Sequence, residues 1–176
     1  MSDNCCADSG MLLLRAVVGG MVAGHGAQKL FGVFGGPGPE GIAGFMEQIG
    51  LKPGGTWGTA AGLSEFCGGT LTALGFLHPL GPVGVMSAMS MATAKVHWGK
   101  PIWAQSGGAE LPVAYAAAAA AVIIAGPGRL TLDKALGIRL PWWVGCAAGA
   151  AAACVLALGV ASPPPPTPSE PNSTGQ

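Results

Sequence analysis

The stretch 12–34, LLLRAVVGGMVAGHGAQKLFGVF, combines the length of a membrane helix with three basic residues. About 20 apolar residues are enough to cross the hydrocarbon core of a bilayer. At 100° per residue, Arg15, His25 and Lys29 fall on one helical stripe roughly 80° wide, with small glycines between them. Because charged side chains avoid lipid, we predict that this stripe faces other helices or a water-filled cavity.

The composition of the whole chain indicates a membrane protein. Half of the 176 residues are hydrophobic and only 9% are charged, with a mean hydropathy of +0.51, whereas about a quarter of the residues in soluble domains are charged. The net charge is zero and there is no basic patch, so nucleic acid is not an expected partner. The 31 glycines suit close helix packing in lipid, although a GC-rich genome would also enrich glycine.

Further apolar segments complete the predicted fold, which is all-α. We predict an integral membrane four-helix bundle, followed by a fifth transmembrane helix at residues 141–161. The first span of the bundle is the stretch 12–34, and the other three are expected at residues 57–77, 83–98 and 111–125. Within the fifth helix, the apolar segment is residues 142–160. Residues 1–10 form a polar N-terminus, and residues 162–176, SPPPPTPSEPNSTGQ, have the composition of a disordered Pro-rich tail.

The connection at residues 35–55 contains a short amphipathic pattern. Ile42, Phe45, Met46 and Ile49 recur at i, i+3, i+4 and i+7, which predicts an interfacial helix lying at the membrane surface. Such a helix could serve as a lid or an apolar entry ramp, or simply as a packed cover.

The later spans contain few ionisable residues, and each of these residues needs a partner or a role because charge is costly in a membrane. Glu65 is alone in the second span, where a carboxyl must be paired, protonated or hydrated. His97 and Lys95 lie about 160° apart on a helix, so we expect His97 to face the bundle and Lys95 to reach the interface. Glu110 precedes Pro112 at the start of the fourth span, which fits either helix capping or a role in a site.

Because successive spans alternate in direction, these polar residues should meet in one half of the bundle. The expected substrate-binding cluster is His25, Lys29, Glu65, His97 and Glu110. Such a cluster could hold a polar head group, relay protons or bind a metal, or it could be a salt-bridge network that locks the helices together. The spacing matches no metal motif, so we predict no metal site. No residue can be assigned a catalytic role.

Several motifs resemble the DoxX family of small bacterial membrane proteins. The resemblance covers residues 11–137 and implies a four-helix bundle in the bacterial cytoplasmic membrane. The resembling residues are Arg15, Gly24-His25-Gly26-x-x-Lys29-x-Phe31-Gly32, Ala94-x-x-His97-x-x-Lys100, Glu110 and Gly126-Pro127-Gly128-Arg129-Leu130-Thr131-Leu132-Asp133. The fifth apolar segment and the proline tail depart from the family pattern.

The resemblance also implies a function. Some DoxX relatives are linked to thiosulfate:quinone oxidoreduction, and mycobacterial members to a complex with superoxide dismutase and a sulfurtransferase that handles oxidative and thiol stress. We therefore expect a membrane subunit of a quinone-linked oxidoreductase or redox-stress complex. In this function, His25 and His97 would form hydrogen bonds or exchange protons with a quinone head group or small anion. Lys29 would bind an anionic group of the ligand, and Glu65 would relay protons. The alternative is a non-enzymatic scaffold or small-solute carrier.

Cofactors, partners and orientation follow from weaker signals. The sequence has no flavin, haem or nicotinamide motif, so the electron carrier is expected to be either quinone or a partner subunit. The expected partners are the lipid membrane and the proteins of a redox complex, and a homo-oligomer is a further alternative. Arg129, Lys134 and Arg139 share one connection, whereas loops on the other side hold Lys52 and Lys100. The positive-inside rule then predicts a multi-pass protein with a cytoplasmic N-terminus.

Overall fold

The computed structural model describes residues 3–163, and all regular secondary structure in this part of the chain is helical. The seven α-helices are α1 (Asp3–Phe31), α2 (Gly38–Gln48), α3 (Gly54–Leu74), α4 (Leu80–Ala92), α5 (Glu110–Ala125), α6 (Leu132–Leu136) and α7 (Trp142–Ala161). Helix α4 continues as a π-helix, η1 (Thr93–His97), and a short 3-10 helix, η2 (Ala104–Ser106), lies in the next loop. The predicted all-α class is confirmed, and the predicted tail beyond residue 163 lies outside the described residues.

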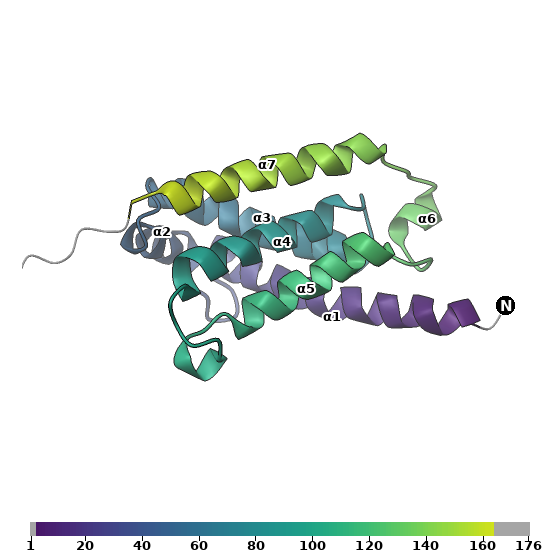
Figure 1. The fold of residues 1–176 in the computed structure, drawn as a ribbon, viewed down its shortest axis with the longest axis horizontal. Helices are drawn as coiled ribbons and strands as arrows, with labels where there is room; N and C mark the ends of the chain where they lie inside the picture. Colours follow the sequence, from purple (N-terminus) through teal and green to yellow (C-terminus); the bar gives the residue numbers. More distant parts are fainter. Residues whose placement is uncertain (1–2, 164–176) are drawn as a thin grey trace, which may run out of the picture.

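Four long helices form the centre of the molecule. Helix α1 packs on α3, α3 on α4, α4 on α5, and α5 returns to contact α1. Helix α7 runs along the outside of this group, against α4 and η1 (Figure 1). Helix α2 covers α1 and α3 at one end of the molecule, and α6 lies at the opposite end, near the N-terminus.

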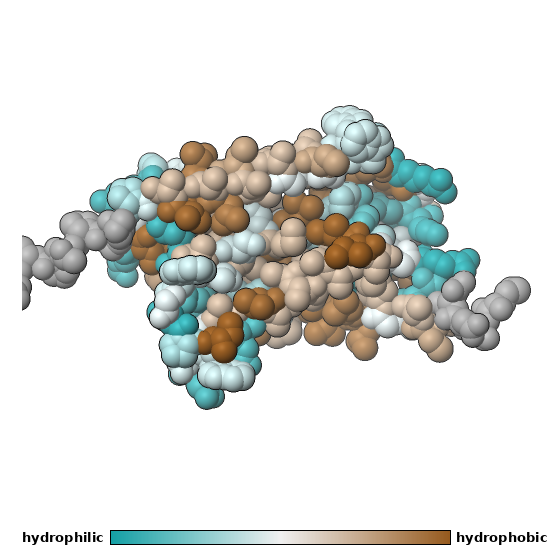
Figure 2. All heavy atoms as spheres, viewed as in Figure 1, coloured by the Kyte–Doolittle hydropathy of each residue, from teal (hydrophilic) through white to brown (hydrophobic). Residues whose placement is uncertain are grey.

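Apolar surface covers the middle of the molecule and polar residues gather toward its ends (Figure 2). Two helices, Cys5–Phe31 and Trp142–Ala161, are long and apolar enough to cross a membrane, and the apolar helix Glu110–Ala125 is shorter. Large side chains such as Leu13 and Ile124 point outward from these helices. Outward-facing apolar side chains around the middle are what a lipid environment requires.

Helix α1 starts earlier than the hydropathy pattern predicts. It begins at Asp3 rather than near residue 12, so most of the polar N-terminus is helical. Asp8 lies in this first part, and its carboxylate accepts a hydrogen bond of 2.8 Å from the backbone N–H of Arg129. Acidic residues near a helix N-terminus interact favourably with the helix dipole, which helps the helix to extend into polar surroundings.

Glycines let α1 and α3 approach at backbone contact. A Cβ atom on Gly19 would lie 2.5 Å from the carbonyl oxygen of Gly69, and one on Gly26 would collide with the backbone of Phe66. Both glycines lie on the stripe that carries the basic residues of α1. The prediction that this stripe faces other helices is therefore confirmed, and its main neighbour is α3.

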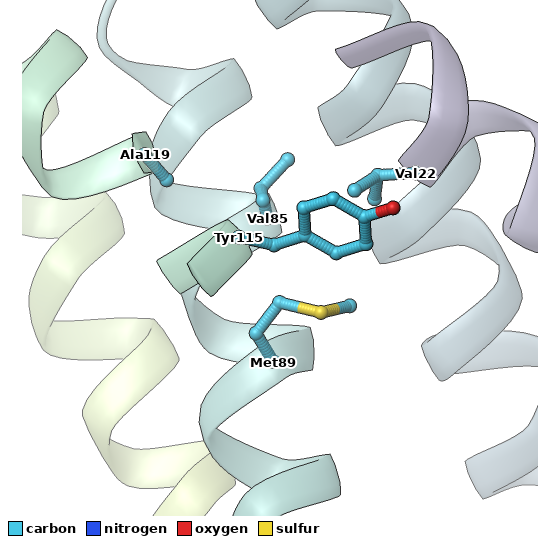
Figure 3. Close-up of a cluster of buried hydrophobic side chains, with 5 residues drawn as sticks. All are labelled: Val22, Val85, Met89, Tyr115 and Ala119. Atoms are coloured by element: carbon cyan, nitrogen blue, oxygen red, sulfur yellow. The ribbon is translucent and has the colours of Figure 1, made fainter. Parts of the chain in front are cut away.

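The apolar core lies where α1, α4 and α5 meet. Its buried members are Val22, Val85, Met89, Tyr115 and Ala119 (Figure 3). The ring of Tyr115 projects from α5 toward Val22 of α1 and occupies the space between the helices. This packing holds α5 against the rest of the molecule, on the side away from α2.

Arg15 joins three parts of the chain at the end opposite α2. Its side chain is 1% exposed, and its guanidinium donates to the carbonyl oxygens of Thr72 (3.3 Å), Ala73 (3.2 Å) and Leu130 (2.6 Å). Thr72 and Ala73 lie in the last turn of α3, where helix carbonyls have no partner within the helix. Arg15 therefore caps α3 and fixes the connection after α5 to it.

Asp133 completes this arrangement from the same connection. Its carboxylate accepts hydrogen bonds from the backbone N–H groups of Leu77 (2.8 Å) and His78 (2.9 Å) in the turn between α3 and α4. Burial lowers the pKa of His78 in this turn; Asp133 opposes the shift and Arg15 adds to it. The Gly126–Asp133 motif thus has a structural task, which is to bind the turn and the end of α3.

Candidate functional site

A cavity of about 210 Å³ lies at the end of the molecule that α2 covers. Its walls come from α1, α2, α3, α4, η1 and α7, so segments far apart in sequence enclose it. The lining residues are mostly apolar, with Lys29, Ser64, Glu65, Ser87 and Lys95 as the polar members.

An ion pair between α1 and α3 forms one side of the cavity. Lys29 Nζ contacts Glu65 Oε2, and Glu65 is only 5% exposed. A carboxylate in such surroundings requires a partner, because burial of an unpaired charge is costly. The lone carboxyl of the second span is therefore paired, which was one of the three states predicted for it.

Apolar and aromatic side chains form most of the remaining surface. Helix α2 supplies Phe45 and Met46, α3 supplies Trp57, and α4 supplies Met91. The amphipathic helix predicted in the connection is confirmed, and its apolar face packs on α3 while also lining the cavity. Val155 of α7 closes part of the wall.

Lys95, rather than His97, faces the cavity, so the predicted orientation of this pair was wrong. Lys95 lines the cavity and its Nζ donates to the carbonyl oxygen of Ser162 at 3.1 Å. His97 turns instead to the following loop, where its Nδ1 lies 2.7 Å from the carbonyl oxygen of Gly107. The helical face explains this, because Lys95 lies on the same side of the helix as Ala88 and Met91, which line the cavity, and His97 lies about 160° away from it.

His25 also lies outside the cavity. Its Nδ1 is 3.1 Å from Gln28 Oε1, and Gln28 Nε2 donates to the carbonyl oxygen of Phe34 at 3.3 Å. These contacts connect the end of α1 to the loop that leads to α2. His25 is therefore placed to organise this loop.

Glu110 has a local role at the start of α5. Its Oε2 accepts a hydrogen bond of 2.8 Å from the backbone N–H of Ala104, inside the loop that precedes the helix. Of the two roles considered for Glu110, the geometry favours the structural one. Of the five predicted site residues, Lys29 and Glu65 meet at the cavity. His97 and Glu110 bond instead to the loop between η1 and α5, and His25 bonds to Gln28 of its own helix.

Sequence reasoning missed Lys95, Trp57 and Val155 as members of the site. The spacing of Lys95 relative to His97 indicated that one of the two faces inward, but it could not reveal which face of α4 borders the cavity. Val155 lies in an alanine-rich segment with no polar pattern, so nothing in the sequence distinguished it from a lipid-facing residue.

A family model described as DoxX matches residues 10–98, just over half of the chain. This chain belongs to the DoxX family. The matched part of this DoxX protein contains Lys29, Glu65 and Lys95, while Val155 and Ser162 lie outside it. Family membership and the apolar helices identify a membrane protein. No curated relative and no solved structure matches the chain.

Proposed function

We propose that this DoxX protein is a membrane subunit of a quinone-linked oxidoreductase or redox-stress complex, and that the cavity binds a quinone head group. The observation that carries the proposal is one partly open cavity that combines Lys29, Glu65 and Lys95 with apolar walls. Ligand sites typically pair a few placed polar groups with apolar surface in this way.

The lining residues fit a quinone by their chemistry. A quinone ring presents carbonyl acceptors on a flat apolar body, and the two lysines supply donors while Trp57 and Met91 supply apolar surface. A volume of about 210 Å³ suits a head group whose apolar tail extends into lipid. A quinone bound here would accept electrons together with protons. Glu65, paired with Lys29, is the carboxyl placed to hold a proton beside it.

For the membrane arrangement, we propose that α1, α3, α4 and α5 form a four-helix bundle in the bacterial cytoplasmic membrane and that α7 is a fifth span. The three basic residues between α5 and α7 support a cytoplasmic N-terminus. The cavity would then lie toward the outer side. A Ser169→Cys variant should react with an impermeant maleimide in intact cells. Labelling that requires opened membranes would contradict either the orientation or the fifth span.

Quinone binding is testable on the purified full chain in detergent. Titration with a short-chain ubiquinone should quench tryptophan fluorescence saturably, and a Trp57→Phe variant should lose most of that quenching. Ala60→Phe places a ring at the cavity wall and should weaken binding, whereas Ala117→Phe, on the exposed face of α5, should not. His25→Ala is a second control, because His25 lies outside the cavity. Absence of saturable binding in the folded wild-type chain would refute the proposal.

One observation favours the rival function, a non-enzymatic scaffold. His97 and Glu110 bond to one loop, His25 bonds to Gln28, which in turn bonds to the loop after α1, and Arg15 caps a helix, so much of the polar sequence serves the fold. If the folded protein binds no quinone but still associates with redox proteins in the membrane, the scaffold function would replace the proposed one.

A further inference from the structure

The charges that line the cavity do not balance. Lys29 is paired with Glu65, and this pair is neutral as a unit. Lys95 adds a second cation to the same space, and Glu65 is the sole acid among the described residues that line it. The described part of the cavity therefore carries one uncompensated positive charge.

Lys95 is half-buried at the cavity. It lies on the face of α4 and η1 that borders this space, and its one hydrogen bond with the described residues goes to the carbonyl oxygen of Ser162, at the end of α7. A helix C-terminus attracts a cation, but its partial charge does not neutralise a full one. The remaining donors of the ammonium group can still bond to a ligand.

The ammonium group of Lys95 is half-buried among apolar neighbours, and a nearby anion would stabilise such a cation. The walls of the cavity are mostly apolar, with Met91, Val96 and Val155 among them, and its acidic side chain, Glu65, is already paired with Lys29. A dianion would leave its second charge unpaired, because Lys29 is already engaged with Glu65. A neutral ligand would leave Lys95 uncompensated. One negative charge on an otherwise apolar molecule matches the lining.

We infer that the preferred occupant of the cavity carries a single negative charge on the head of an apolar body, and that Lys95 binds this charge. The inference rests on the proposed function insofar as the head group is a quinone, for which the charge would be an ionised ring hydroxyl. It makes Lys95 the residue that determines specificity for charge, a role that Lys29 cannot take while it is paired.

Two probes of the same shape isolate the charge. The compound 2-hydroxy-3-methyl-1,4-naphthoquinone is ionised at neutral pH, and 2,3-dimethyl-1,4-naphthoquinone is neutral; substitution at both ring positions limits attack by the cysteines. Decanoate, a single-chain carboxylate, is the third probe. Affinities are measured by calorimetry on the full chain in a neutral detergent, for wild type, Lys95→Gln, Lys95→Arg and the matched loop control Lys100→Gln.

The wild-type protein should bind the ionised quinone at least about tenfold more tightly than the neutral one, a difference of roughly 1.4 kcal/mol. Lys95→Gln should abolish this preference while the neutral quinone still binds, and both Lys95→Arg and Lys100→Gln should keep it. Equal wild-type affinity for the two quinones would overturn the inference, whether or not Lys95→Gln folds. A preference that persists in folded Lys95→Gln would overturn it too.

The two proposals fail in different ways. Binding of both quinones without charge preference would leave the quinone function standing and refute the role of Lys95. Binding of decanoate that depends on Lys95, with neither quinone bound, would support the anion site and refute the quinone function. If none of the three probes binds to the folded protein, both proposals fall.

Discussion

Replacement of Arg15 by methionine tests whether its buried guanidinium holds the molecule together. Methionine has a similar length and no charge, so the substitution removes the three hydrogen bonds to Thr72, Ala73 and Leu130 with little loss of volume. The end of α3 then loses both its cap and the cation that its dipole favours.

The magnitude follows from two opposing terms. Each hydrogen bond from a charged donor contributes about 1.5–3 kcal/mol, so three are worth roughly 5–9 kcal/mol. Removal of the buried charge recovers several kcal/mol of desolvation cost. Arg15 Nε, which has no hydrogen-bond partner among the described residues, adds to that recovery. We expect a net loss of about 2–4 kcal/mol, which for a chain of this size lowers the melting temperature by roughly 5–15 °C.

Thermal unfolding in mild detergent, followed by circular dichroism, measures the effect. Arg15→Lys should show an intermediate loss, because it keeps the charge but not the planar fork that reaches several carbonyls. Arg139→Met is the matched control, since Arg139 is exposed, and it should change the melting temperature little. A melting temperature for Arg15→Met within about 1–2 °C of wild type would refute the reasoning, because the hydrogen bonds would then merely offset desolvation.

Three further predictions concern other parts of the molecule. Glu65→Gln should preserve the fold but weaken quinone binding, with Lys29→Gln as the reciprocal variant; unfolding of either, seen by size exclusion, would favour a structural salt bridge. Burial lowers the pKa of His78 below 6.5, so its contribution to stability is full above pH 6.5 and is lost as the pH falls through the folded-state pKa. Between about pH 5 and 8, where histidine usually titrates, the melting temperature of His78→Gln should therefore depend less steeply on pH than that of the wild type. An identical pH dependence in the two proteins would contradict this. Gly26→Val should separate α1 from Phe66 and lower the melting temperature, whereas Gly24→Val, which meets no atom within 4 Å, should not.

The sequence predicted the elements of the fold better than their contacts. Hydropathy located the long helices, and the i, i+3, i+4 spacing of Ile42, Phe45 and Met46 located α2, because both patterns report which face of a helix avoids water. The stripe on α1 correctly predicted contact with other helices. In each case the relevant physics is local, so the sequence contains it directly.

Convergence of the polar residues was predictable only in part. Lys29 and Glu65 are opposite charges in apolar spans, and pairing is the least costly arrangement for them. The inward position of Lys95 depends on which face of α4 borders the cavity, and the bonds of His97 and Glu110 depend on the path of the loop between η1 and α5. These features arise from packing between distant segments, which spacing along one helix does not encode.

The position of Arg15 has a consequence for the order of events during synthesis. Arg15 belongs to the first helix to leave the ribosome, but one of its three acceptors, Leu130, is made more than a hundred residues later. Until then the cation has at most the end of α3 to bond with, in a membrane where an incompletely satisfied charge is costly. Truncated chains that end before Leu130 should therefore remain with the insertion machinery or its chaperones longer than the complete chain does. The last contact of Arg15 thus marks the point at which α1, α3, α4 and α5 can enter the bilayer as one unit, before α7 is made.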